Sequence, residues 1–320
     1  MNLDENLNNS LISNKLSSLP NISKKQCFHY IMLSNIFFSI CSFIPKYLLN
    51  KFNKIYNPFS ILFIRAISII ITSIIISKLQ NVNLFHIKNL PHKKWFILKA
   101  FLKFIRLISF LYSLLYIRCI IFQTIIVLFP LVYMTKDFII NHFQFTKIYI
   151  YCLFSCIVGT YLLISNEFLY STKENIIKGV LLSISSLLIQ SIINYIDLQF
   201  GLINYNINNH LLYINIFILI ICTIYYLFSP FRFSTFYIII NIINGIIFSI
   251  SVNLKMFYRK NLTIAKNYIW LNSFRVLYVY ILLFLFTNEE ENFVDLIGIF
   301  IIIVFLIYNS FPLFSNKIFY

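Results

Sequence analysis

The feature that most constrains this chain is a series of ten apolar stretches, each long enough to cross a bilayer. Most contain about 20 residues, which is what ~30 Å of hydrocarbon requires at ~1.5 Å per helical residue. The sequence therefore predicts an all-α integral membrane protein with ten transmembrane helices. The expected spans are Tyr30–Leu49, Pro58–Ser77, Phe96–Tyr116, Cys119–Ile139, Thr146–Ser165, Ile176–Ile196, His210–Phe228, Thr235–Met256, Tyr268–Thr287 and Phe293–Tyr308.

Composition excludes a single water-soluble domain. Hydrophobic residues make up 60% of the chain and charged residues only 11%, whereas about 25% of a soluble domain is charged. The formal net charge of +16 belongs mostly to loops beside anionic lipid headgroups, so we expect a lipid bilayer as partner and no nucleic acid. The sequence leaves open which membrane holds the protein, and its oligomeric state.

The spans form two similar halves. A shift of 146 residues moves Tyr30, where the first span begins, to Ile176, where the sixth begins, and moves span five onto span ten. Because five is an odd number, a second copy must enter the membrane from the opposite side, which gives two inverted five-helix repeats. The expected organisation is a polar cytosolic tail (1–29), the first repeat (30–165), a linker (166–175), the second repeat (176–312) and a C-terminal tail (313–320).

Positive charges deep inside the spans point to a binding site. Lys99, Lys103 and Arg106 recur at i, i+4 and i+7 and so share one helix face. Arg106 lies about 15 Å along the axis from Phe96, near the bilayer midplane. Arg65 and Arg275 are similarly placed within their spans. Charges nearer the span ends are expected to snorkel to the interface; these are Lys46, Lys99, Lys136 and Lys255.

Carboxylates lie only at span ends or in loops, so the deep charges are all basic. Basic side chains around a central cavity would attract an anionic solute, and we take Arg106, Arg65, Arg275 and Lys103 as candidate binding residues. Buried amides either complete such a site or join helices to one another. The amides that we expect beside the cavity are Gln123, Asn194 and Asn244.

The sequence contains no HExxH, no Gly-rich phosphate loop and no GxSxG, and its cysteines form no CxxC pairs. We therefore expect no metal, no cofactor and no enzymatic activity.

The order of several weak matches resembles the drug/metabolite transporter superfamily, specifically its EamA-like and solute-carrier-35-like members. The signature is a Pro-bearing helix, then an acidic residue, then a Gly about nine residues later. The first half keeps Pro130, and the second keeps Glu289 and Gly298. Arg65 in the second span and Gly159 in the fifth also resemble family positions. Phe143, Cys152 and Val276 depart from the pattern.

The resemblance implies alternating access in a helical bundle with a solute site between the halves. Together with the basic residues, it predicts a carrier for a small anionic metabolite, such as a phosphorylated sugar, a nucleotide sugar or an organic acid. Two other classes fit the same composition, namely a non-transporting membrane scaffold or receptor and a polytopic membrane-embedded enzyme. Solute flux separates the carrier from both.

Loop charges predict that both termini are cytosolic, because the loops on that side hold more Lys and Arg and the opposite side holds the acidic run Glu289–Glu291. Engineered cysteines in the tail between Asn2 and Lys25 and near Asn316 should react with an impermeant thiol reagent from the same face of the membrane. Labelling of the two ends from opposite faces would contradict an even number of spans.

Overall fold

A computed structural model describes residues 24–52, 57–80, 93–127, 147–169, 171–199, 207–231, 233–259, 264–286 and 293–308. Within these ranges the regular structure is entirely helical. The helices are α2 (Lys24–Lys51), α3 (Pro58–Leu79), α4 (Lys93–Tyr116), α5 (Cys119–Val127), α7 (Lys147–Glu167), α8 (Lys173–Gln199), α9 (Ile207–Phe228), α10 (Thr235–Arg259), α11 (Ile264–Phe286) and α12 (Phe293–Tyr308).

Five described helices are long and apolar enough to cross a bilayer, namely α2, α3, α8, α9 and α10. The protein is therefore a multi-pass membrane protein. The helix α4 carries five cations, at Lys93, Lys94, Lys99, Lys103 and Arg106, which sets its composition apart from that of an ordinary lipid-facing span. The apolar parts of α11 and α12 are shorter.

Helix bounds agree with most of the expected span positions. The helix α2 begins six residues before Tyr30, inside the expected tail, and α8 begins at Lys173, inside the expected linker. The rest of the tail (1–23), the second part of span four (128–139, with Pro130), Glu289 and the chain from 309 onward lie outside the described residues.

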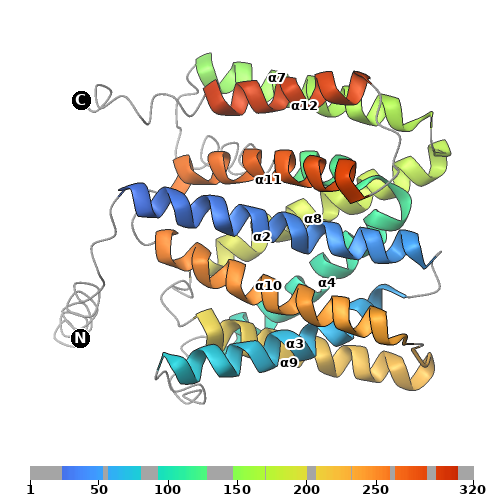
Figure 1. Ribbon diagram of the computed structural model, residues 1–320, viewed down its shortest axis with the longest axis vertical. Helices are drawn as coiled ribbons and strands as arrows, with labels where there is room; N and C mark the ends of the chain where they lie inside the picture. The colour runs from blue at the N-terminus through green and yellow to red at the C-terminus, as the bar shows by residue number, and fades with distance from the viewer. Residues whose placement is uncertain are drawn as a thin grey trace.

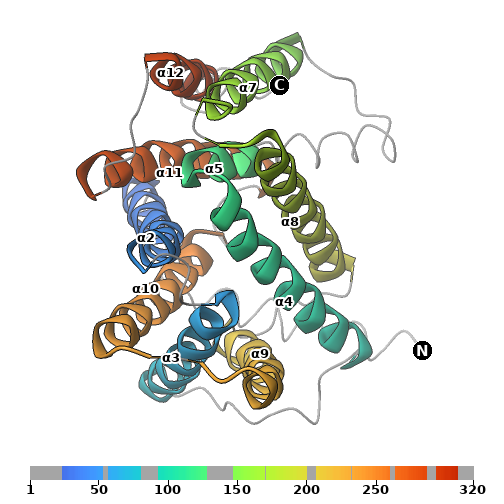
Figure 2. The ribbon, with the colours of Figure 1, turned by 90° about the vertical axis from the view of Figure 1, so that its right-hand side faces the viewer.

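Helices far apart in the sequence pack in pairs. The helix α7 lies along α12 at one edge of the molecule and α3 lies along α9 at the opposite edge, with α11, α2 and α10 between them (Figure 1). The helices α4 and α8 pack closely against each other, as do α2 and α10 (Figure 2). The start of α2 and the end of α12 lie at the same end of the bundle (Figure 1).

The outer surface is apolar, whereas many buried positions are polar. Ile71, Ile224 and Phe300 are more than half exposed. Buried serines join the helices: Ser34 Oγ on α2 donates to the carbonyl of Ser251 on α10 at 3.1 Å, and Ser68 Oγ on α3 donates to the carbonyl of Ile242 on α10 at 2.7 Å. This distribution is typical of helices that associate within a bilayer, where apolar contacts alone provide no preference for a protein neighbour over lipid.

Two glycines permit the close approach of α7 and α12. A Cβ atom on Gly159 would lie 2.8 Å from the carbonyl oxygen of Gly298, and one on Gly298 would lie 3.0 Å from the carbonyl oxygen of Gly159. Any larger residue at either position would push the helices apart. Small residues at a helix contact are the usual solution for tight packing in membranes.

A buried ion cluster ties this pair of helices to the rest of the bundle. Arg118, in the turn between α4 and α5, donates from Nε to Oε2 of Glu167 at the end of α7 (2.5 Å). Its Nη1 and Nη2 atoms donate to the two carboxylate oxygens of Asp295, in the first turn of α12 (2.7 and 3.2 Å). All three side chains are buried. One guanidinium therefore holds three segments together through a fork geometry that lysine could not reproduce.

Replacing Arg118 with Ala should strongly destabilise the protein, because two carboxylates would be left buried without their cation. Loss of one partner from a buried pair typically costs about 3–5 kcal/mol. Thermal unfolding in detergent should show a large drop in the midpoint. The control is Lys178→Ala, which removes an exposed cation paired with Glu174 and should leave the midpoint almost unchanged. Equal stability of both variants would show that the cluster contributes nothing.

Candidate functional site

A central cavity of about 250 Å³ lies among α2, α3, α4, α5, α8, α9, α10 and α11. It reaches Ile207 at the start of α9, Asp197 near the end of α8 and Lys255 near the end of α10. These helix ends lie at the same end of the bundle as the start of α2 (Figure 1). The cavity thus extends from that end into the middle of the bundle.

The cavity wall is strongly basic. Among the described residues that line it, six are Lys or Arg and one, Asp197, is a carboxylate. A concave site with one sign of charge in a low-dielectric surrounding concentrates ions of the opposite sign. The basic residues are Arg65, Lys99, Lys103, Arg106, Lys255 and Arg275.

Two of these cations, Arg65 on α3 and Arg275 on α11, form what we call the arginine pair. The thiol of Cys41 on α2 experiences the charge of both. Arg65 is buried, its guanidinium carbon lies 4.3 Å from the centre of the Phe248 ring, and its Nε atom has no hydrogen-bond partner. Arg275 donates from Nη2 to Oγ of Ser42 at 2.5 Å.

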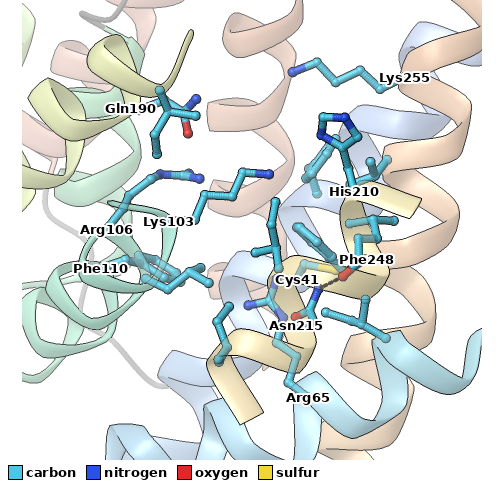
Figure 3. Close-up of a pocket in the computed structure, with 18 of the residues that line it drawn as sticks. Cys41, Arg65, Lys103, Arg106, Phe110, Gln190, His210, Asn215, Phe248 and Lys255 are labelled. Atoms are coloured by element: carbon cyan, nitrogen blue, oxygen red, sulfur yellow. Dashed lines mark hydrogen bonds between the residues drawn. The ribbon is translucent and has the colours of Figure 1, made fainter. Parts of the chain in front are cut away.

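The opposite wall carries Lys103 and Arg106, which we call the α4 cations. Figure 3 shows both side chains entering from α4, while Arg65 enters from α3 on the other side. Both α4 cations are half-buried. The charges nearest to Lys103 include those of Lys99, Asp197, Arg106 and Lys255.

Lys99 does not snorkel to the interface, so that expectation was wrong. Its side chain is buried, forms an ion pair with Asp197 and lies 2.9 Å from Nδ1 of His210. The structure brings a carboxylate from α8 and an imidazole from α9 to this lysine, which stabilises its charge without contact with the headgroups.

Lys46 was also expected to snorkel and instead lies buried. Its Nζ atom donates to the carbonyls of Leu114 (2.9 Å) and Ile117 (3.1 Å). The last carbonyls of a helix lack partners within the helix, so the end of α4 supplies acceptors for this ammonium. Lys255 is half-buried against the cavity, with Nζ 5.8 Å from the centre of the Phe38 ring. Lys136 lies outside the described residues.

Five of the seven candidate residues line the cavity, and two do not. Arg65, Lys103, Arg106, Asn194 and Arg275 are at its wall.

Gln123 and Asn244 are fully buried outside the cavity. Phe122 and Ile126 are the α5 residues at the wall, so Gln123 points about 100° away from Phe122 on the same helix. Asn244 lies one turn before Phe248 on α10, and its carbonyl accepts from Sγ of Cys41, a lining residue, but Asn244 itself is not at the wall.

Two amides at the wall, Asn35 and Gln190, were considered from the sequence but were not among the three expected beside the cavity. Asn35 and Gln190 are amides of the same kind as Asn194, and Gln190 donates to Asn194 at 2.7 Å. The spacing of Gln190 and Asn194 at i and i+4 on α8 was the available sequence signal that they share one helix face. The lining residues Phe38 and Phe248 could not have been distinguished from the other phenylalanines of the spans, because phenylalanine occurs throughout this chain.

Contacts at the start of α3 precede Leu62, the first residue of this helix at the cavity wall, and we call them the seal. Asn57 donates from Nδ2 to Oη of Tyr225 on α9, and Oγ of Ser60 lies within hydrogen-bond distance of Oη of Tyr237 on α10, both at 2.7 Å. The rings of Phe59 and Tyr225 stack with centroids 4.0 Å apart. These contacts join α3 to α9 and α10 on the side opposite the start of α2.

The basic residues at this wall can attract and hold anions. In the described part of the chain, no three His, Cys, Asp or Glu side chains come together in a group that could hold a metal ion. Comparison with known proteins found no family model and no curated protein that matches this sequence. The functional argument therefore depends on the cavity and its charges.

Access to the cavity should be one-sided. In a chain whose six cysteines are replaced by Ser, an Asn194→Cys variant should react with an impermeant thiol reagent from the face where α2 begins, because Asn194 is half-buried at the cavity wall. The matched Asn57→Cys variant, at the seal, should not react from that face. Equal labelling of Asn194→Cys from both faces would mean that the seal does not close the cavity.

Proposed function

We propose that the protein is a carrier that moves a small anionic metabolite across the membrane by alternating access. The observation that carries the proposal is the central cavity, whose described wall holds six basic side chains and one carboxylate. Deep charges in a membrane protein usually face a water-filled cavity and mark a solute or ion pathway.

Helix pairing supports an inverted repeat with ten membrane crossings. If α2, α3, α4, α5 and α7 correspond in order to α8, α9, α10, α11 and α12, the contact of α4 with α8 corresponds to the contact of α10 with α2. The contacts of α3 with α9, α5 with α11 and α7 with α12 each join corresponding helices. This is the pattern expected of two halves related by a two-fold axis in the membrane plane.

A departure from this symmetry supports alternating access. The helix α3 packs extensively along α10, whereas the corresponding contact between α9 and α4 is much smaller. The interface of α3 with α10 is therefore extensive and its counterpart, α9 with α4, is small. This difference is expected when the solute site is open to one face of the membrane at a time. The complementary state would loosen the first interface and tighten the second.

Counterflow in proteoliposomes tests the proposal directly. Small phosphorylated sugars and organic acids should exchange, and amines of similar size should not. High salt should weaken uptake at low solute concentration, because screening reduces the attraction of the basic cavity for anions. Selective transport of organic cations, without competition by anions, would refute the proposal. Absence of any flux would favour a scaffold or receptor.

Arg106 should be required for transport. Its guanidinium stays charged at any relevant pH and can bind a phosphate or carboxylate through two parallel hydrogen bonds, which lysine cannot form. Counterflow should therefore fall to near background in Arg106→Ala and be weakened, roughly tenfold, in Arg106→Lys.

The control is Lys178→Gln, which removes an exposed positive charge at the start of α8 and should transport normally. Folded yield and bilayer insertion of the Arg106 variants are measured in parallel. Full transport per folded molecule by Arg106→Ala would eliminate a binding role for this residue. Loss of folded protein with normal transport by the remainder would assign it to the structure of the bundle.

A further inference from the structure

We infer that the solute carries two separate anionic groups, one bound by the arginine pair and the other by the α4 cations. The inference rests on the proposed carrier function and deepens it by naming the solute class as short metabolites with an anionic group at each end. The relevant geometry is that Lys103 and Arg106 enter the cavity from α4 and Arg65 enters it from α3 (Figure 3), with Arg275 of α11 also at the wall.

The arginine pair has the properties of an oxyanion subsite. Arg65 is 4% exposed and Asn35, on the neighbouring α2, is 3% exposed, and both line the cavity. The Nε atom of Arg65 and the Nδ2 atom of Asn35 have no hydrogen-bond partner. Buried donors without partners are rare and costly, and a carboxylate or phosphate oxygen at this wall would satisfy them.

The present contact of the Arg65 guanidinium is with an aromatic face rather than a carboxylate. The ring of Phe248, 4.3 Å from the guanidinium carbon, stabilises the positive charge through its quadrupole. Such a contact occupies the face of the planar group and leaves its edge, where all the N–H donors lie, directed elsewhere. An anion can therefore bind at the edge while the ring contact remains.

The α4 cations form a second subsite with different neighbours. Lys103 and Arg106 lie one turn apart on the same helix face. Arg65 and Arg275, by contrast, reach the cavity from α3 and α11. Each anionic group of the solute would thus interact with its own set of cations.

The size of the cavity limits the distance between the two anionic groups. Its volume is about 250 Å³, which is below the ~300–1,000 Å³ typical of pockets for drug-sized ligands. A nucleotide sugar is larger than such ligands and does not fit this volume. A chain of a few carbon atoms with an anionic group at each end does fit.

Binding to the purified full-length protein in nanodiscs at low salt tests this inference independently of flux. Two probe pairs are compared, each matched except for a second anionic group: succinate with butyrate, and 3-phosphoglycerate with glycerol 3-phosphate. Thermal stabilisation gives each affinity, because a ligand that binds only the folded state raises the unfolding midpoint. In at least one pair the two-headed probe should bind about tenfold more tightly or better, since each charge-assisted contact is worth about that factor.

Variants identify the two subsites. Arg65→Gln and Arg106→Gln should each reduce the preference for the two-headed probe at least about fivefold, whereas Lys178→Gln should keep it. If Arg65→Gln does not fold, Arg65→Lys, which retains the charge and loses the fork, should still reduce the preference. Equal binding within both pairs, or a preference that survives both Gln substitutions, would overturn the inference. Anion transport could persist in those cases, and the proposed function would fail only if no anion were transported.

Discussion

The cost of placing positive charge inside a bilayer determines how this bundle is assembled. The structure lowers this cost in three ways, each at a different place in the bundle. Arg118 is neutralised by two carboxylates at a junction of three segments, Lys46 by the free carbonyls at the end of α4, and Arg65 lies against an aromatic ring at the cavity wall. The first two arrangements are complete, because their donors already have strong acceptors. The third leaves a buried donor for a partner from outside the chain, which is why we propose the cavity, rather than the ion cluster, as the site of function.

Hydrophobic length was sufficient to predict the described helices and most of their bounds. Depth along a helix also predicted that Arg65, Lys103, Arg106 and Arg275 would lie at one cavity, because a charge near the midplane cannot reach the headgroups. The predictions failed where the position of a side chain depends on the rotation of its helix about the axis or on a partner residue from another helix. Gln123 follows the lining residue Phe122 and faces away from the cavity. The bounds of a span do not specify how the helix is rotated about its axis, so they could not show which of these two neighbours faces the cavity.

The environment of Lys99 shows a second limit of sequence reasoning. Asp197 and Lys99 are almost 100 residues apart, and their ion pair requires α4 and α8 to pack side by side at matching depth. Each residue alone is close enough to a helix end to reach the interface, so snorkelling was the simpler expectation. The same holds for Arg118 with Glu167 and Asp295, whose pairing depends on the contact between α7 and α12. Long-range ion pairs follow from the packing of helices, and that packing cannot be read from the spans of a single sequence.

The helix α3 connects the solute site to the seal. Arg65 faces the cavity, while Ser60 and Asn57, about 7.5 and 12 Å away along the same axis, bond to Tyr237 and Tyr225. A helix held by unbroken backbone bonds moves as one body over such distances, so any movement of the α3 backbone at Arg65 on anion binding would also displace the seal. The seal consists of two hydrogen bonds and stacked rings, without an ion pair among these contacts, and each hydrogen bond contributes only about 1 kcal/mol. Binding energy of the size expected for two charge-assisted contacts is therefore sufficient to change the balance between a closed and an open far end.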